Sequence, residues 1–98
     1  MGLPEITRNE LVAVGTSSLT IAEANPRSSI YIRNSSTGVQ VITVLFSQAQ
    51  LAVANAGFVL KPGEFIVDST TAGYQCYQGK VQAIGDAVAG QVSIFERN

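Results

Sequence analysis

The chain has 98 residues, which is enough for one compact domain but not for two independent hydrophobic cores. Hydrophobic residues make up 46% of the sequence and charged residues only 13%, a balance that excludes an intrinsically disordered chain. The net charge of −1 provides no basic surface for nucleic acid, and the sequence has no histidine, the commonest general base and metal ligand. We therefore expect a domain that binds no nucleic acid. Because charged residues are few, we also expect part of its surface to be apolar and covered by a partner.

The first nine residues contain Pro4 and show no hydrophobic periodicity. We expect an irregular N-terminal arm over residues 1–9, followed by a single β-sandwich domain over residues 10–98. The start of the sequence has neither the basic region nor the long apolar run of a signal peptide, and no run approaches the length of a membrane span. These features predict a protein made in the cytoplasm that does not contact a membrane.

The rest of the sequence is a succession of short β-prone runs bounded by glycine, proline, serine, threonine and asparagine. The runs cover residues 11–14, 19–23, 28–34, 39–46, 57–60, 64–68, 74–84 and 91–96. The gaps between them are too short for the crossover helices that a parallel sheet needs. The sequence therefore predicts an all-β fold of about seven or eight short antiparallel strands, arranged as a jelly-roll-like sandwich or as a barrel, with no long helix.

The run over residues 28–34 is the clearest half-buried strand. Its alternation places Ile30 and Ile32 on one face and Tyr31 and Arg33 on the other. We expect the two isoleucines in the core. Tyr31 and Arg33 are then candidates for a surface contact, since a tyrosine at a subunit contact can keep its hydroxyl in water.

The run over residues 39–46 differs because both of its faces are mostly apolar. One face carries Val39, Val41, Thr43 and Leu45, and the other carries Gln40, Ile42, Val44 and Phe46. An antiparallel strand with one face in water does not need this pattern. Two explanations remain: a central strand covered by loops or strand ends, or a strand that packs one face on a second subunit.

Two connections follow this run. Residues 47–56 are compatible with one short helical turn or with an irregular loop, and Gly57 would suit the position after a helix. The sequence Lys-Pro-Gly-Glu at residues 61–64 predicts a type II turn, because proline fixes φ at the second position and glycine allows positive φ at the third. This turn type matches the twist of a tight hairpin poorly, which favours a corner between two sheets.

Residues 74–84 are typical of one strand that bends at Gly79. Cys76 within this run is the only cysteine, which excludes an intrachain disulfide. A reactive thiol needs a nearby base, and no histidine is present to provide one. We therefore expect Cys76 to be buried and unreactive.

The glycine-bounded segment over residues 85–90 leads into a strand and not a helix, so we expect a hairpin loop and not a phosphate site. In the final run, residues 91–96, Val92 and Ile94 share one face.

No nucleophile elbow, P-loop or dinucleotide-binding motif occurs in the sequence. Glu64 and Asp68, four residues apart, would lie about 13 Å apart on one strand face, too far for a glycosidase pair. No loop has more than one carboxylate for calcium. We predict no catalytic residue, no cofactor and no metal, and therefore not an enzyme. The cations occur singly and are expected on the solvated surface: Arg8, Arg27, Arg33, Lys61, Lys80 and Arg97.

Three segments occur in an order that resembles small β-sandwich structural proteins of tailed bacteriophages, in particular head-decoration (cement) proteins. They are residues 27–36 (RSSIYIRNSS), residues 57–64 (GFVLKPGE) and residues 92–96 (VSIFE). The resemblance spans residues 27–96, about two thirds of the chain. It implies a virion protein that sits on the surface of an assembled capsid, often as a trimer, and clamps neighbouring subunits of the major capsid protein.

Because such a protein works through surfaces, we expect contact residues in place of a catalytic set. The candidates are Arg8 in the arm, Tyr31 and Arg33 on the half-buried strand, and Ile42, Val44 and Phe46 on the two-faced strand.

Two other functions remain open. One is a carbohydrate- or receptor-binding module of a phage fibre or tail, which would use loops at one end of the sandwich and Tyr31, Tyr74 or Tyr77. The other is a small jelly-roll enzyme, which the absence of histidine disfavours because metal sites in such folds rely on imidazole.

Overall fold

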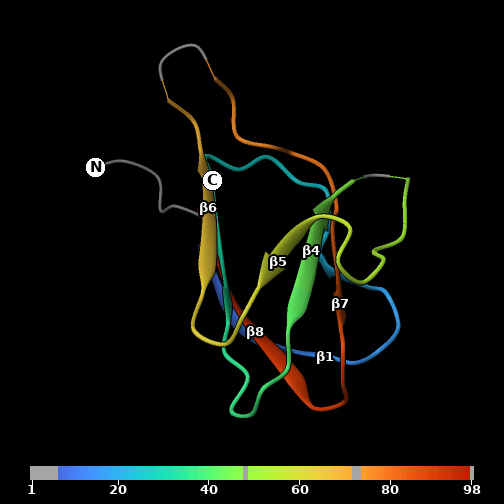
Figure 1. Ribbon diagram of the computed structural model, residues 1–98. Helices are drawn as coiled ribbons and strands as arrows, with labels where there is room; N and C mark the ends of the chain where they lie inside the picture. The colour runs from blue at the N-terminus through green and yellow to red at the C-terminus, as the bar shows by residue number, and fades with distance from the viewer. Residues whose placement is uncertain (1–6, 48, 72–73, 98) are drawn as a thin grey trace.

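The computed structural model describes residues 7–47, 49–71 and 74–97. Within them the chain forms eight β-strands in two four-stranded antiparallel sheets, and these residues contain no helix (Figure 1). Sheet A contains, in spatial order, β1 (Thr7–Val14), β8 (Gly90–Arg97), β3 (Ser29–Asn34) and β6 (Phe65–Ser69). Sheet B contains β2 (Leu19–Ala22), β7 (Val81–Gly85), β4 (Ile42–Phe46) and β5 (Phe58–Leu60). The predicted all-β class is confirmed.

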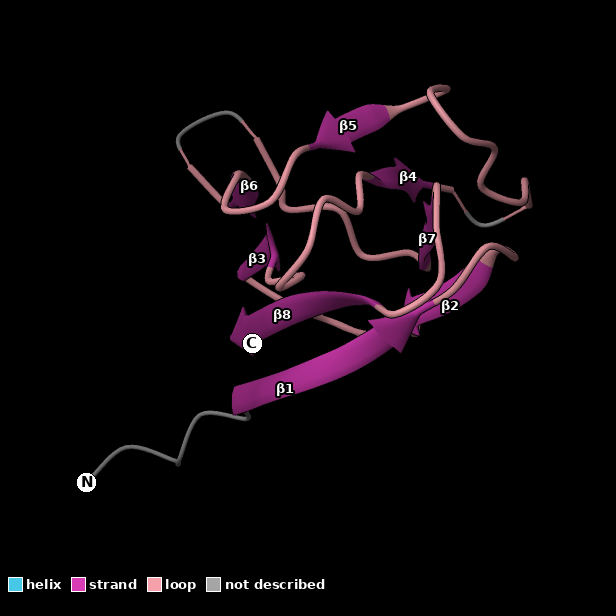
Figure 2. Cartoon of the chain, turned by 60° about the horizontal axis from the view of Figure 1, so that its bottom comes forward, coloured by secondary structure: helices cyan, strands magenta, loops and turns pink. Residues whose placement is uncertain are grey.

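The strand pairing is nested: β1 pairs with β8, β2 with β7, β3 with β6 and β4 with β5. The chain thus folds back on itself at the β4–β5 connection, and successive pairs fall in alternate sheets. This is the arrangement of a jelly roll, with two open sheets in place of one closed barrel. Figure 2 shows β1 and β8, from opposite ends of the sequence, running side by side.

The core lies between the sheets and follows the alternation of the strands. Ile30 and Ile32 of β3 have 1% and 0% of their surface exposed, which confirms the predicted inward face of that strand. Val92 and Ile94 of β8 are buried in the same cluster. Each such side chain contributes about 1.5–3 kcal/mol when it is removed from water. The other fully buried members are Val14, Ile21, Ala22, Ile42, Val44, Leu60, Cys76, Val81 and Ala83.

The turn predicted at residues 61–64 is a corner between the sheets, because it connects β5 of sheet B to β6 of sheet A (Figure 1, yellow). Glu64 donates its backbone N–H to the carbonyl of Lys61 at 2.9 Å, and Gly63 has a positive φ of 89°. The Glu64 carboxylate also accepts a hydrogen bond from the N–H of Lys61 at 2.7 Å. Hydrogen bonds within the corner, together with those that Gly63 and Glu64 make with Asn34 of β3, therefore hold its conformation.

The arm predicted over residues 1–9 needs a correction. Thr7, Arg8 and Asn9 belong to β1, which pairs along its whole length with β8. A neighbouring strand of equal length satisfies the backbone groups of these residues, and this pairing outweighs their weak hydrophobic periodicity. Residues 1–6 lie outside the described residues.

The strand predicted over residues 39–46 begins at Ile42 and lies between β5 and β7. Ile42 and Val44, two of the candidate contact residues, are 0% exposed and belong to the protein's own core. Their assignment to a contact surface is therefore wrong, because a side chain without exposed surface cannot contact a partner.

The loop of residues 47–57 covers the opposite face of β4. Thr43 accepts a hydrogen bond from the N–H of Asn55 at 3.0 Å, and Ala52 is buried. The described residues of this loop form no helical turn. A Cβ on Gly57 would lie 2.6 Å from the carbonyl oxygen of Val44, so this glycine permits the close approach of the loop to β4. The first explanation for the two apolar faces, a covered central strand, therefore holds.

Two predictions near the C-terminus also change. Of residues 74–84, only the part from Val81 onward forms a strand, β7. Residues 86–89 connect β7 of sheet B to β8 of sheet A, so this connection is a loop between sheets and not the predicted hairpin loop.

Candidate functional site

Four apolar side chains lie together on the outer face of sheet A. The register places Tyr31 opposite Val67 of β6 on one side and opposite Phe95 of β8 on the other. Phe65 lies two residues before Val67 on β6 and therefore shares its face. We call Tyr31, Phe65, Val67 and Phe95 the aromatic face.

The aromatic face is open to solvent. Phe65 and Val67 have 57% and 56% of their surface exposed, and Tyr31 and Phe95 are half-buried. The rings of Tyr31 and Phe65 stack with their centroids 5.2 Å apart. A group of large exposed apolar side chains is typical of a surface that binds a partner.

A shallow hollow of about 450 Å³ lies on the same face. Apolar groups of Tyr31, Val67 and Phe95 line it together with the smaller or polar side chains of Asn9, Ser29, Ser93 and Arg97. This volume falls in the range of small-ligand pockets. The hollow can therefore accept an apolar side chain of a partner or one small ligand.

The described outward positions of sheet A carry positive charge only. The charged residues among them are Arg33 and Arg97, and the others are Asn9, Leu11, Ala13, Ser29, Tyr31, Phe65, Val67, Ser69, Gln91, Ser93 and Phe95. A partner surface with carboxylates around an apolar centre is complementary to this pattern.

The structure separates the six candidate contact residues. Tyr31 and Arg33 lie together on the outer face of sheet A. Arg8 lies in β1, the edge strand of the same sheet, and its side chain bonds Glu96 on the inner face. Phe46 packs against the core, where its ring stacks on Tyr77 with centroids 5.4 Å apart. The tyrosines of the carbohydrate-binding hypothesis are also separated, since Tyr77 packs against the core while Tyr31 faces outward.

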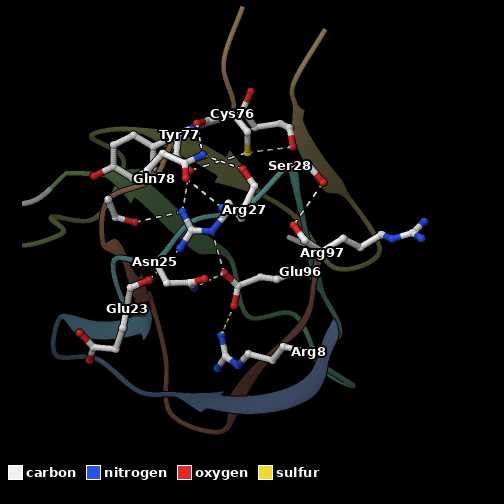
Figure 3. A network of polar contacts seen from close by, with 12 residues as sticks. Arg8, Glu23, Asn25, Arg27, Ser28, Cys76, Tyr77, Gln78, Glu96 and Arg97 are labelled. Carbon is white, nitrogen blue, oxygen red and sulfur yellow. Dashed lines mark hydrogen bonds and ion pairs between the residues drawn. The ribbon is translucent and has the colours of Figure 1, made fainter. Parts of the chain in front are cut away.

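A buried ion-pair network lies at the β1–β2 side of the sandwich (Figure 3). Glu96 continues the inward alternation of Val92 and Ile94, so its carboxylate points between the sheets. Its Oε2 accepts a hydrogen bond from Nε of Arg27 at 2.7 Å, and its Oε1 accepts one from Nη1 of Arg8 at 2.9 Å. The side chain of Arg27 is 0% exposed, so the prediction that it lies on the solvated surface is wrong.

The remaining contacts of Arg27 are with backbone carbonyls. Nη1 donates to the carbonyls of Tyr77 and Gly79 at 2.6 and 3.1 Å, and Nη2 donates to the carbonyl of Glu23 at 2.7 Å (Figure 3). The carbonyls of Tyr77 and Gly79 belong to the segment before β7, so this segment bonds to the guanidinium of Arg27. A buried charge is stable only when it is paired in this way.

Gln78 joins the same two segments. Its Oε1 accepts a hydrogen bond from the N–H of Arg27 at 2.9 Å, and its Nε2 donates to the carbonyl of Arg27 at 2.6 Å. Both oxygens of Glu96 are engaged as well. The network therefore connects the segments that contain Arg8, Arg27, Gln78 and Glu96.

Among the described residues, four groups have pKa values shifted from their ordinary values. The hydrogen bond between Arg8 and Glu10, 2.8 Å long, raises the pKa of the guanidinium and lowers the pKa of the carboxyl. Burial raises the pKa of the Cys76 thiol and of the Tyr77 hydroxyl. The predicted burial of Cys76 is confirmed, and the raised pKa disfavours the reactive thiolate.

Within the part of the chain that the structure describes, no three His, Cys, Asp or Glu residues are grouped so that they could hold a metal ion. The same residues contain no helix long and apolar enough to cross a membrane.

No protein-family model matches this chain, and a comparison with curated proteins also finds no match.

The sequence alone does not predict that Phe65, Val67 and Phe95 lie beside Tyr31. The alternation of each strand is visible in the sequence, but the register between strands is not. The burial of Glu96, in contrast, can be predicted from the sequence. The period of two that places Val92 and Ile94 inward also places Glu96 inward.

Proposed function

We propose that this protein is a non-enzymatic structural component of a virion, which binds the outside of an assembled capsid and stabilises it as a homo-oligomer. In this proposal it is made in the host cytoplasm and becomes part of the capsid surface. Its partners are the major capsid protein and further copies of itself.

The observation that carries the proposal is the exposed aromatic face on a rigid sheet. Its large apolar side chains lie on three neighbouring strands of the sheet, β3, β6 and β8, beside the cations Arg33 and Arg97. The resemblance to head-decoration proteins adds the type of partner, an assembled capsid. The low share of charged residues, 13%, fits a surface that is covered in its working state.

The proposed mechanism is the burial of this face across a junction between capsid subunits. Aromatic anchors seated in the partner would supply most of the binding free energy, and the arginines would select a surface with carboxylates. A joint of about 1,600 Å² is the standard size for a stable interface.

Charge reversal on this face tests the proposal. Purified protein is sedimented with assembled capsids of the bacteriophage that encodes it, and the bound fraction is measured at several salt concentrations. We expect Arg33→Glu to weaken binding at least about tenfold, because like charges then oppose each other across the interface. Lys61→Glu is the control, since it makes the same change of charge at the exposed corner between the sheets. Absence of binding by the unaltered protein, or equal loss in both variants, would overturn the proposal.

The hollow favours a second candidate function, a carbohydrate-binding module of a fibre or tail. The ring of Tyr31 can stack on a sugar, and the polar side chains of Asn9, Ser29 and Ser93 beside it can hydrogen-bond to the sugar hydroxyls. A glycan-array signal that Tyr31→Ala abolishes and Tyr74→Ala retains would support this function over capsid binding.

A further inference from the structure

Strand β6 is an open edge of sheet A. Within the described residues it pairs with β3 only. Just beyond the two ends of the strand, Asn34 donates its N–H to the carbonyl of Glu64 at 2.9 Å, and Thr70 donates its N–H to the carbonyl of Ser28 at 2.7 Å. Backbone groups of alternate residues point to the same neighbour in an antiparallel pair. The even-numbered residues therefore bond to β3, and Phe65, Val67 and Ser69 direct their N–H and C=O groups away from the sheet.

This edge lacks the features that normally protect an edge strand. Natural proteins place charged side chains, proline or a bulge on such strands to prevent pairing with another chain. The outward side chains of β6 are the exposed Phe65 and Val67, together with Ser69. Its one charged residue, Asp68, alternates to the other face, where Oδ2 accepts a hydrogen bond from the N–H of Tyr77 at 2.8 Å.

The charges around β6 select one register for pairing with an identical strand. A twofold axis at Asp68 would place two aspartates opposite each other. An axis at Ile66 would place Asp68 opposite Glu64 of the second copy. Like charges directly opposite each other destabilise a strand pair. An axis at Val67 avoids both conflicts, since it pairs Phe65 with Ser69, Ile66 with Asp68 and Val67 with its own equivalent.

We propose that a second copy of this chain pairs antiparallel with β6 about a twofold axis at Val67. The two four-stranded sheets then form one continuous eight-stranded sheet. All three residues that direct their backbone groups outward fall in hydrogen-bonded pairs in this register, which gives about six new backbone hydrogen bonds. The same symmetry places Phe65 diagonally next to Val67 of the second copy, so the two aromatic faces become one surface.

This inference concerns the chain with itself and goes beyond capsid binding. It is tested on the purified full chain without a capsid, so its failure and the failure of the capsid proposal are separate results. The first measurement is the mass in solution by sedimentation velocity over a range of micromolar concentrations. We expect a dimer, twice the chain mass of 10.3 kDa. A monomer or a trimer as the main species would overturn the proposal.

Charge substitution at the axis gives a sharper test. Val67→Lys and Val67→Glu each place two like charges opposite each other, and we expect each to raise the dimer dissociation constant at least about 100-fold. Because residue 67 faces its own equivalent, an equimolar mixture of the two variants should restore the dimer. Val39→Lys and Val39→Glu are the controls, since Val39 is 87% exposed outside the strands. A dimer that persists in either Val67 variant, or a mixture that stays monomeric, would overturn the register.

Hydrogen exchange of the unaltered protein provides a test that needs no substitution. The N–H of Val67 points away from β3, so it is protected only when a second copy is present. We expect its exchange to be slow at concentrations above the dimer dissociation constant and at least about tenfold faster after dilution below it. Fast exchange at every concentration would contradict the proposal even if the charged variants failed to fold.

Discussion

Along one side of the sandwich, where β1 and β2 are the edge strands, charged side chains join the two sheets. Arg8 extends from β1 to the carbonyl of Ile21 in β2 at 3.0 Å and also pairs with Glu96. Along the other side, where β5 and β6 are the edge strands, the exposed side chains are apolar, and they include Phe58, Val59, Phe65 and Val67. The same jelly roll thus closes one pair of edges with its own charges and leaves the other pair apolar and open.

This difference separates stability from binding. The ion pairs on the β1–β2 side find all their partners within the chain, so their effect is on the free energy of unfolding. The apolar groups on the β5–β6 side find few partners within the chain, so their effect is expected on association. Substitutions on the two sides should therefore change different measured quantities.

The largest effect is expected from breaking the closed side at Arg27. Arg27→Met leaves the Glu96 carboxylate buried with Arg8 as its remaining ion-pair partner and removes the donors to the carbonyls of Tyr77 and Glu23. Removal of one member of a buried ion pair typically lowers the free energy of unfolding by about 3–5 kcal/mol. Urea denaturation measures this loss.

Arg33→Met is the control for this substitution, because Arg33 is exposed on the outer face and its loss should change stability by no more than about 0.5 kcal/mol. Equal stability losses in the two variants would contradict the distinction between the two sides.

A smaller effect is expected at the corner that leads into the open side. Gly63→Ala forces a residue with a Cβ into a φ of 89°, at a cost of about 1 kcal/mol in unfolding free energy. Gly15→Ala is the control, since a Cβ there meets no atom within 4 Å and the backbone has no such positive φ. Thermal unfolding of both variants should show a lower Tm for Gly63→Ala alone. An equal loss of Tm in Gly15→Ala would show that the positive φ of residue 63 is not the cause of the destabilisation.

The smallest effect is expected from the exposed ion pair of the closed side. The pKa of Glu10 is lowered in the folded protein by its hydrogen bond to Arg8. The pair therefore stabilises the fold above the ordinary pKa of a glutamate, and this contribution is lost as the pH falls through the lowered pKa. We expect Tm to fall slightly less between pH 6 and pH 3 in Glu10→Gln than in the unaltered protein. A steeper fall of Tm in Glu10→Gln would contradict a stabilising effect of the Arg8–Glu10 pair on the folded protein.

The sequence predicted the features that depend on neighbours along the chain. The alternation around Ile30 and Ile32 identified a strand and its buried face. The Lys-Pro-Gly-Glu sequence identified the corner at residues 61–64, because its φ requirements are local. The all-β class followed from the spacing of such signals.

The features that depend on contacts between distant segments could not be predicted from the sequence. Arg27 and Glu96 are 69 residues apart, so their ion pair exists only once β8 lies beside β3. The contact role assigned to Ile42 and Val44 failed for the same reason, since a loop and a second sheet enclose β4 from both faces. The aromatic face required the register of three strands, which a pattern with a period of two does not fix.

The pairing of the first and last strands also determines how this fold responds to mechanical force. Thr7 lies opposite Arg97, so the two ends of the described chain leave sheet A at the same point. Tension between them would separate β1 from β8 one hydrogen bond after another, and not all bonds at once. The Arg8–Glu96 ion pair lies one residue inside that point and is therefore loaded among the first contacts. We expect a low unfolding force for a load applied at the two ends, which strengthening this ion pair would raise more than added burial at the β4–β5 connection.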